Sequence, residues 1–398
     1  MEVILQKKLK FYNLPFYQFC IAVFVTGVAI RAIVYQFFAK TFTFPDTETY
    51  QDFAENLLHG SIQNPNIMPG YPLFLELSNI LGLGVALDIL ISVCTSFVGG
   101  ALVLRLSGNK IFAGLAILLL CFNPYLIFFS TVQLSETIYI FFLVMGLYLC
   151  VIGRVFFAIN FLMIAIYIKP VLEPLFFLLV YAMGWAWKQE SDVRPVKLAL
   201  VAIIVYCALL FPWWVHNFEK YGVFVRTTLA APIVLYAGNN ELNKSGAGQY
   251  GVDFSLEDFS HIENPITANK EILNSAIDFI RSDYSRFLAM GVQKVARQMN
   301  PLPNAVVFHS AVFNACLVCF YLMVWVIFLL ALVISIKTRT GLRQFLPFLL
   351  YVGYSLLVCF VFIGSVRYRV PAEVMAILFG CGVLGCYFKP VNRGANVV

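Results

Sequence analysis

The segment 44–72, FPDTETYQDFAENLLHGSIQNPNIMPGYP, is polar in a chain that is otherwise strongly apolar. Apolar side chains recur along its first half at the spacing of one face of an α-helix: they are Tyr50, Phe53, Ala54, Leu57 and Leu58. Acidic residues occupy the opposite face: they are Glu48, Asp52 and Glu55. This pattern predicts a short amphipathic helix that lies on a membrane surface, with the carboxylate of Asp46 unpaired at its leading end.

The ends of this expected helix carry residues that favour helix boundaries. The side-chain oxygen of Asp46 or Thr47 can cap its start, because such an oxygen accepts hydrogen bonds from backbone N–H groups of the first turn. Gly60 is a favourable stop, since glycine adopts the left-handed conformation that ends many helices. We expect the chain then to turn sharply at Pro69–Pro72 and to continue into apolar sequence.

Outside this segment the composition is that of a membrane protein. The chain has 398 residues, of which 61% are hydrophobic and 12% charged, whereas soluble domains are about one quarter charged. Apolar runs of about 17–25 residues, the length of a helix that crosses a bilayer, recur along the whole sequence. The short alternating segments of a membrane β-barrel are absent, so we predict an all-α polytopic membrane protein. Its net charge of +6 comes from dispersed basic residues and does not indicate a nucleic-acid partner.

The apolar runs predict about ten transmembrane helices. Their expected boundaries are 16–38, 82–104, 110–128, 134–152, 154–168, 171–187, 196–214, 306–335, 344–363 and 371–388. The run 16–38 follows several lysines but has no clear cleavage site, so we interpret it as a retained first span and not as a signal peptide.

Basic residues decide the expected orientation, because cytoplasmic loops are enriched in lysine and arginine. With the N-terminus inside, the inner side collects a large set of basic residues: Lys7, Lys8, Lys10, Arg105, Lys110, Arg154, Lys188, Arg194, Lys197, Lys337, Arg339, Arg343, Lys389 and Arg393. Most acidic residues then lie outside. We therefore expect a multi-pass protein of the inner or plasma membrane, with both termini in the cytoplasm.

In this orientation two long segments, 39–81 and 215–305, lie on the outer side, and 306–398 forms the last transmembrane part of a single domain. Short outer loops include 123–135 and Lys169–Glu173. Within the second long segment the run 270–299 predicts a helix. Its apolar residues could form a membrane-facing stripe: they are Ile272, Ala276, Ile280, Tyr284 and Phe287.

Asp46 is the main candidate for a catalytic group. An ionised carboxylate at a helix N-terminus can accept a proton from a hydroxyl, which is the task of a general base. The alternative is a residue that only caps the helix. Glu136, at the start of an expected span, is a second candidate, because acids at the membrane edge are costly unless they are exposed, paired or functional. It would orient the neighbours of Asp46 or bind sugar hydroxyls; the alternative is a helix start at which Ser135 is the capping residue.

Three basic residues stand at the outer ends of expected spans, against the general trend. Arg367 and Arg369 precede the last expected span in the sequence GSVRYRVP, and Lys169 follows the fifth. A guanidinium group suits phosphate because it offers a planar fork of donors. We predict that these three residues bind the phosphate of a lipid-linked donor; the alternative is that they reach out to lipid headgroups.

Other residues of the outer side are candidates for substrate binding: they are Glu48, Tyr50, Tyr71, His216, Asn217 and Tyr368. No histidine or cysteine spacing typical of a transition-metal site occurs. No phosphate-binding loop stands between a strand and a helix. We therefore expect neither a metal nor a cofactor, and a donor other than a soluble nucleotide.

Several blocks of the sequence are similar, in order and spacing, to the C-type (GT-C) glycosyltransferase superfamily of membrane enzymes. The chain most resembles the bacterial branch related to protein O-mannosyltransferases and the lipid A aminoarabinose transferase. The blocks are PDTETYQDFAENLLHG, PGYPLFLEL, NPYLIFFSTVQLSETIYIFFL, IKPVLEPLFF, FPWWVHNFEKYGVFVRTT, AIDFIRSDYSRFL and SVRYRVPAEV, and they extend over nearly the whole chain. Relatives commonly have arginine where this chain has His216 and Lys169, and often before the PGYP turn, where this chain has Ile67 and Met68.

The resemblance implies a helical core with amphipathic helices on its outer face, and a sugar donor carried on a polyprenyl phosphate. The essential aspartate of the family's first outer loop matches Asp46, and the acid of the second outer loop matches Glu136. The basic and aromatic element before a late span matches Arg367, Tyr368 and Pro371.

The sequence as a whole predicts an integral-membrane glycosyltransferase. It would pass a sugar from the lipid-linked donor to a hydroxyl of a glycan, lipid or protein outside the cytoplasm, with inversion at the anomeric carbon. Asp46 would be the base, and 215–305 would cover the site. The runner-up interpretation is a secondary transporter or lipid flippase, although Arg31 and Asp88, the charges nearest the expected spans, form no proton relay. A catalytically silent partner in a cell-envelope complex is a third.

Overall fold

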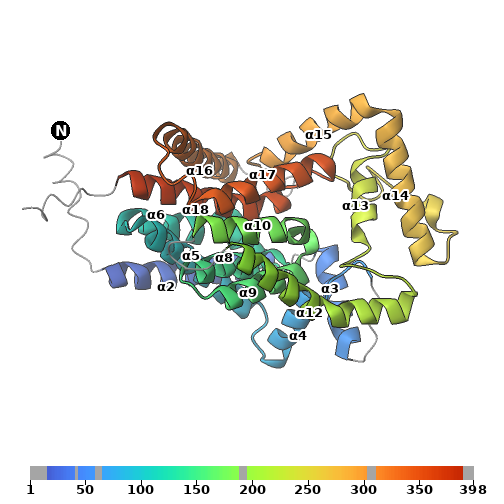
Figure 1. Ribbon diagram of the computed structural model, residues 1–398, viewed down its shortest axis with the longest axis horizontal. Coiled ribbons are helices and arrows are strands. Elements are labelled where there is room, and N and C mark those ends of the chain that lie inside the picture. The colour runs from blue at the N-terminus through green and yellow to red at the C-terminus, as the bar shows by residue number, and fades with distance from the viewer. Residues whose placement is uncertain (1–15, 41–43, 59–64, 188–194, 303–310, 389–398) are drawn as a thin grey trace, which may run out of the picture.

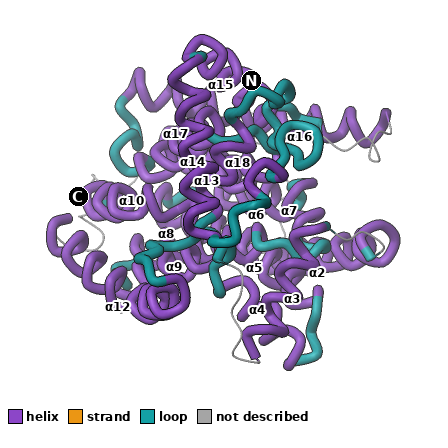
Figure 2. The backbone as a smooth tube through the Cα atoms, turned by 90° about the vertical axis from the view of Figure 1, so that its right-hand side faces the viewer, coloured by secondary structure: helices purple, strands orange, loops and turns teal. Residues whose placement is uncertain are grey.

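The computed structural model describes residues 16–40, 44–58, 65–187, 195–302 and 311–388. These residues are mostly helical and contain no β-strand (Figure 1, Figure 2). The predicted all-α fold class is thereby confirmed for the described part of the chain. Among the described residues, five helices are long and apolar enough to cross a membrane: Phe16–Ala39, Val85–Ser107, Pro195–Tyr221, Asn314–Thr338 and Val366–Tyr387.

Five shorter apolar helices pack among the long ones: Lys110–Cys121, Glu136–Val151, Val155–Ile168, Pro170–Ala186 and Leu346–Val361. The described parts of the ten apolar segments expected from the sequence fall mainly on these two sets of helices; residues 306–310 of the eighth segment lie outside the described residues. Most of them run along the long axis of the molecule, which is horizontal in Figure 1.

In chain order the apolar helices and their short extensions are α2 (Phe16–Val34) with the π-helical turn η2 (Tyr35–Ala39), α5 (Val85–Ser107), α6 (Lys110–Cys121), α7 (Pro124–Phe129), α8 (Glu136–Val151), α9 (Val155–Ile168), the 3-10 turn η3 (Pro170–Leu172), α10 (Glu173–Ala186), α12 (Pro195–Tyr221), α16 (Ala311–Thr338), α17 (Leu346–Val361) and α18 (Val366–Tyr387). The other elements are α3 (Pro45–Leu58), α4 (Gly70–Ile80), α13 (Ala230–Gly238), η4 (Glu257–Phe259), α14 (Pro265–Ser282) and α15 (Tyr284–Met299). Helices α3, α13 and α14 gather at the right-hand end of Figure 1, opposite the N-terminus.

Helix α18 lies at the centre of the bundle. It packs against α5, α6, α8, α15, α16 and α17, and every residue from Arg369 to Gly385 is buried. Glycine permits one of the closest approaches: a Cβ atom at Gly382 would lie 2.1 Å from the ring of Phe345. The packing of α18 against its neighbours therefore determines which residues Arg367, in its first turn, can contact.

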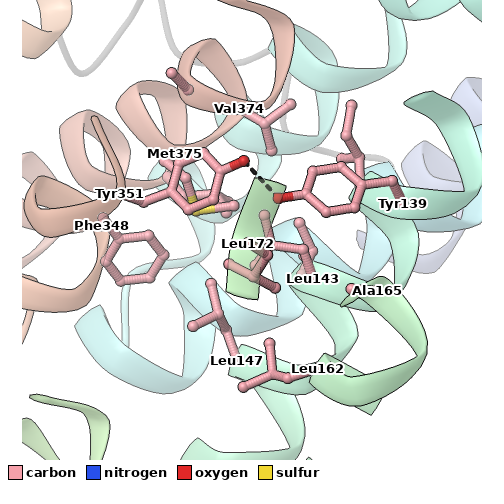
Figure 3. Close-up of a cluster of buried hydrophobic side chains, with 14 of the residues drawn as sticks. Tyr139, Leu143, Leu147, Leu162, Ala165, Leu172, Phe348, Tyr351, Val374 and Met375 are labelled. Atoms are coloured by element: carbon pink, nitrogen blue, oxygen red, sulfur yellow. Dashed lines mark hydrogen bonds between the residues drawn. The ribbon is translucent and has the colours of Figure 1, made fainter. Parts of the chain in front are cut away.

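The core between α8, α9, α17 and α18 consists of close-packed aliphatic side chains such as Leu143, Leu162 and Val374 (Figure 3). Two buried tyrosines in this core, Tyr139 and Tyr351, satisfy each other through a hydrogen bond of 2.7 Å between their hydroxyl groups. A buried hydroxyl without a partner costs about 1–3 kcal/mol. The pairing therefore allows both rings to enter the core and joins α8 to α17.

The expected span 110–128 is wrong as a single helix, because the chain ends one helix and starts another at Asn123. The side-chain oxygen of Asn123 accepts hydrogen bonds from the backbone N–H groups of Tyr125 (2.9 Å) and Leu126 (3.1 Å), and so caps α7. Pro124 occupies the first helical position, where its missing N–H group costs no hydrogen bond.

The expected helix 270–299 is also two helices, α14 and α15, which meet at Asp283. The Asp283 carboxylate accepts a hydrogen bond of 3.0 Å from the N–H group of Arg286 and caps α15. The first half of the expected membrane-facing stripe is wrong, because Ile272 and Ala276 are buried where α14 packs against α13. Tyr284 of α15 is exposed.

The last apolar helix starts at Val366, earlier than the expected boundary of 371. Ser365 caps it, because its hydroxyl oxygen accepts a hydrogen bond of 3.3 Å from the N–H group of Arg367. Arg367 and Arg369 therefore belong to the first turns of α18 and do not lie in a preceding loop.

Candidate functional site

Helix α3 carries the first residue of the candidate site. It begins at Pro45, so Asp46 and Thr47 lie inside its first turn, and the prediction that one of them caps the helix is wrong. Both side chains have tertiary partners instead. The Thr47 hydroxyl donates to the carbonyl of Val132 (3.3 Å), and the Asp46 carboxylate pairs with Arg367. Gly60, the expected stop, lies outside the described residues.

Arg367 joins the two candidate acids. Its Nη1 contacts Oδ2 of Asp46, and its Nε contacts Oε1 of Glu136. Lys169 Nζ donates to the same oxygen of Glu136 at 2.5 Å. We call Asp46, Glu136, Lys169 and Arg367 the charged cluster. Its members come from α3, α8, the end of α9 and α18, so the fold brings together four residues that the sequence indicated one by one.

Exposure divides the charged cluster into a buried and an open part. The side chain of Glu136 is fully buried, that of Lys169 is 12% exposed and that of Arg367 is 23% exposed, whereas Asp46 is 52% exposed. A buried carboxylate is costly unless it is paired, and Glu136 has two cations beside it. With two cations and two carboxylates, the cluster carries no net charge. Glu136 therefore pairs with both cations on the buried side of the cluster. Asp46 is the acid that a molecule from solution can reach.

The start of α8 does not show the capping expected as an alternative role for this region. Ser135 stands at the capping position but makes no side-chain capping hydrogen bond. Its hydroxyl lies 3.4 Å from that of Tyr50 on α3. Oε2 of Glu136 has no hydrogen-bond partner among the described residues. The side chains of Ser135 and Glu136 therefore contact residues of the candidate site and do not cap α8.

Three tyrosines surround the charged cluster. The ring of Tyr50 packs edge-on against that of Tyr71, with centroids 4.8 Å apart, and Lys169 Nζ lies 5.4 Å from the ring centre of Tyr368. Burial raises the pKa of Tyr50 to about 12 and raises that of Tyr71 well above its usual range. Both hydroxyl groups therefore remain protonated near neutral pH. Burial also lowers the pKa of Lys169, and the Glu136 carboxylate opposes this shift.

Helix α4 begins at Gly70, where the sequence led us to expect only a sharp turn. A Cβ atom at Gly70 would lie 2.6 Å from the backbone carbonyl of Tyr167, so the absence of a side chain lets α4 approach the end of α9. Tyr71 is consequently fully buried, and its hydroxyl has no hydrogen-bond partner among the described residues. A bound molecule or a water that paired with it would remove a cost of about 1–3 kcal/mol.

A cavity of about 340 Å³ opens beside the charged cluster. Tyr50, Lys169 and Tyr368 form part of its wall. Most of the remaining wall is apolar and includes Met68, Ile168, Val171, Val234, Val358 and Phe362. An apolar cavity with a few convergent polar groups is the usual form of a ligand site.

The same wall holds an ion pair that the sequence did not lead us to expect. Oε2 of Glu173 lies 2.8 Å from Nη2 of Arg226, and Oε1 of Glu173 accepts a hydrogen bond of 2.8 Å from the Tyr206 hydroxyl. Arg226 lies in the block FPWWVHNFEKYGVFVRTT, but it was not among the expected phosphate-binding residues. The available signal was that it is an arginine expected outside the membrane, the criterion that led to Arg367.

Arg369 does not belong to the charged cluster. It is fully buried, 3.3 Å from Oε2 of Glu373, and it donates to the carbonyl of Gln298. Its guanidinium lies between the rings of Tyr125 (4.8 Å) and Tyr321 (4.3 Å). Because none of its surface is exposed, we leave Arg369 out of the proposed phosphate site.

Tyr71 and three other expected substrate-binding residues lie outside the described cavity wall. The three others are His216, Asn217 and Glu48. His216 stacks on Trp213, with ring centroids 5.5 Å apart. Asn217 is buried and donates to the carbonyl of Trp213 at 2.8 Å. Glu48 is exposed on α3. The structure brings none of the three into the charged cluster, and their roles stay predictions.

No protein-family model, no curated protein and no solved structure matches the chain. The resemblance to the C-type glycosyltransferases therefore depends on the sequence blocks alone and stays a prediction. Within the described ranges, no group of three or more His, Cys, Asp or Glu side chains could hold a metal ion.

Proposed function

We propose that the protein is an integral-membrane glycosyltransferase that moves a sugar from a polyprenyl phosphate to a hydroxyl acceptor outside the cytoplasm. One observation carries the proposal: Arg367 joins an exposed carboxylate, Asp46, to a buried one, Glu136, and Lys169, which also pairs with Glu136, lines a largely apolar cavity. A lipid-linked donor needs an apolar surface for its chain beside cations for its phosphate. The cavity and the charged cluster offer both within a few side chains of each other.

The proposal includes the orientation of the protein. The ten apolar helices would be the membrane spans, and the end that holds α3, α13 and α14 would face outward, because the lysines and arginines of the short loops favour the opposite side. Val252 is 64% exposed in the segment expected outside, and Lys337 is exposed at the end of α16. An impermeant thiol reagent should label Val252→Cys in intact cells and Lys337→Cys only after permeabilisation, above the background of the parent protein. The reverse pattern would contradict the orientation.

In the proposed reaction the cations act on the leaving group. Negative charge grows on the phosphate as its bond to the sugar breaks, and fixed cations stabilise that charge in the transition state. Lys169 and Arg367 are placed to do so, since Glu136 holds both. A phosphate that takes over the contact between Arg367 and Asp46 would release the Asp46 carboxylate.

Asp46 is then the base. The acceptor oxygen attacks the anomeric carbon, its proton passes to Asp46, and the bond between the sugar and the phosphate oxygen breaks on the opposite side. The polyprenyl phosphate keeps the electron pair of the broken bond, and a single displacement inverts the anomeric centre. Glu136 is unsuited to this step, because it is fully buried and its Oε1 is bound by two cations.

Release of polyprenyl phosphate tests the proposed function directly. Purified protein in detergent is incubated with polyprenyl phosphates that carry a hexose or a pentose, together with cell-envelope extract as a source of acceptors, and the lipid products are identified by mass spectrometry. The wild-type protein should release polyprenyl phosphate from at least one donor, and Asp46→Asn should release it about 10²–10⁴-fold more slowly. Release from none of the donors would contradict the proposal.

One observation favours the second candidate, a secondary transporter or lipid flippase. Asp88 of α5 is fully buried, and neither of its carboxylate oxygens has a hydrogen-bond partner among the described residues. Acids within a membrane are functional by default. Arg31 is no partner for it, because its guanidinium binds the Ser92 hydroxyl (3.1 Å) and the Cys121 carbonyl (2.9 Å). Asp88→Asn should abolish the activity of a transporter but leave polyprenyl phosphate release by a transferase intact.

A further inference from the structure

The cavity wall contains a second ion pair that the proposed transfer step does not use. Lys169 and Arg226 are the cations among its described lining residues, and each contacts a buried carboxylate. They differ in accessibility, since the side chain of Arg226 is 59% exposed and that of Lys169 is nearly buried. Arg226 contacts Glu173 through Nη2, and no other hydrogen bond of its guanidinium occurs within the described ranges. The rest of the guanidinium fork is therefore open to a ligand.

The chain around Arg226 is held in place before any ligand arrives. The indole N–H groups of Trp214 and Trp213 donate to the carbonyls of Arg226 (2.8 Å) and Thr227 (2.6 Å). The carboxylate that orients the guanidinium, that of Glu173, is itself fixed by the Tyr206 hydroxyl. Because backbone and side chain are both positioned, little conformational entropy is lost when a ligand binds.

Helix α13 begins just after this arginine and adds to its attraction for an anion. Ala230 and Ala231 of its first turn line the cavity together with Thr227 and Thr228. The capping residue Leu229 makes no side-chain hydrogen bond, and the N–H group of Ala230 has only a long one, 3.4 Å, to the Thr228 hydroxyl. First-turn N–H groups and the helix dipole favour negative charge.

We propose that Arg226, Thr227, Thr228 and the first turn of α13 form a second oxyanion site in the cavity, separate from the site at Lys169 and Arg367. Its ligand is a phosphate or carboxylate group. The acceptor can supply this group, and so can the headgroup of a neighbouring membrane lipid. The assignment to the acceptor rests on the proposed transfer reaction, in which Lys169 and Arg367 hold the donor.

Equilibrium binding of radiolabelled inorganic phosphate to the purified full chain, in a non-ionic detergent, tests this proposal. The wild-type protein should show two classes of site, of which a short-chain polyprenyl phosphate displaces one. Arg226→Gln should weaken the remaining class by about 10- to 100-fold, the effect of losing a hydrogen bond to a charged group, whereas Lys169→Gln should weaken the displaced class. Arg281→Gln, which alters an exposed arginine of α14, is the matched control and should bind as the wild-type protein does.

A single class of phosphate site, or unchanged phosphate binding by Arg226→Gln, would overturn the proposal. It would also fail if Arg226→Gln weakened polyprenyl phosphate binding as much as Lys169→Gln does, because Arg226 would then belong to the donor site. If Arg226→Gln does not fold, Arg226→Lys decides, since it keeps the pair with Glu173 but removes the fork. It should weaken only the class that polyprenyl phosphate does not displace.

Competition separates the two sources of the oxyanion. In nanodiscs, phosphatidylglycerol should displace phosphate from the second class if the ligand is a lipid headgroup. If it does not, the ligand is an anion from solution, as an acceptor would be. No sugar transfer is measured in these experiments, so their failure leaves the release assay untouched, and failure of the release assay leaves the binding result standing.

Discussion

Arg367 and Arg369 stand two residues apart in α18, and the structure gives them opposite surroundings. Arg367 contacts carboxylates from two distant parts of the chain and keeps a partly exposed side chain. Arg369 is fully buried beside Glu373, one turn further along its own helix. Residues two apart in an α-helix point about 200° away from each other. A single turn of α18 therefore presents one guanidinium to the charged cluster and the other to the core.

The difference shows how to interpret a cation that stands against the charge bias of a membrane protein. Both arginines met that criterion, but of the two only Arg367 has exposed surface and pairs with an exposed acid. Arg369 has a buried acid four residues away, and Glu373 in turn accepts a hydrogen bond of 2.7 Å from Asn123. We infer that Arg369 fixes the start of α18 and so sets the position of Arg367.

The largest effect is expected from Asp46→Asn, which changes the exposed acid that pairs with Arg367. Asparagine keeps the size of the side chain but cannot accept the acceptor's proton, so turnover should fall by about 10²–10⁴, the usual contribution of a general base. Thermal unfolding should stay close to that of the wild-type protein, because Asp46 is half exposed. Near wild-type release of polyprenyl phosphate by Asp46→Asn would end its assignment as the base.

On the buried side, Arg369→Ala should lower the free energy of unfolding by about 3–5 kcal/mol, because it leaves Glu373 buried without a counter-charge. Denaturant unfolding in detergent measures the loss. The double variant Arg369→Met, Glu373→Leu should recover most of it, since an apolar pair of similar size needs no counter-charge. An Arg369→Ala protein with normal stability but weak phosphate binding would reverse the roles of the two arginines.

Arg367→Gln should weaken binding of a polyprenyl phosphate by about 1.5–3 kcal/mol, the scale of a hydrogen bond to a charged group. Its effect on stability should be smaller than that of Arg369→Ala, because Lys169 remains beside Glu136. Titration calorimetry with the purified variant measures the affinity, with Arg281→Gln as control. Unchanged affinity would favour the alternative, in which Arg367 contacts lipid headgroups.

The smallest effect, taken per pH unit, concerns Lys294 of α15, a buried cation that pairs with no acid among the described residues. Its Nζ donates to Oδ1 of Asn239 at 2.9 Å, and burial lowers its pKa to about 8. An unfolded chain, in which lysine has a pKa near about 10, binds more protons between these values. The free energy of unfolding should therefore rise with pH in this window, by up to about 1.4 kcal/mol per unit.

Lys294→Met removes the titrating group and should flatten this rise. Unfolding curves at several pH values between about 7 and 10, recorded for both proteins, measure the difference. Parallel pH profiles would show that burial does not lower the pKa of Lys294, and that α15 carries a buried lysine that stays charged without a facing acid.

Local properties of the sequence were enough to establish the all-α class, the ten apolar segments and the helix α3. Helical periodicity and long apolar runs depend on a few turns of chain at a time, and so do start signals such as Asn123 and Pro124, which we overlooked. The members of the charged cluster were also found locally: Asp46 by its place at the start of an amphipathic helix, and Glu136, Lys169 and Arg367 as charges at the ends of apolar segments.

Only the tertiary structure decided how these charges pair. Arg367 meets Asp46 across 321 positions of the chain, and no periodicity encodes such a contact. The same is true of the cap that Asp46 does not form, of the pair between Glu173 and Arg226, and of the burial of Arg369. Each of these depends on which side of one helix faces another, and packing of the whole bundle around α18 determines that.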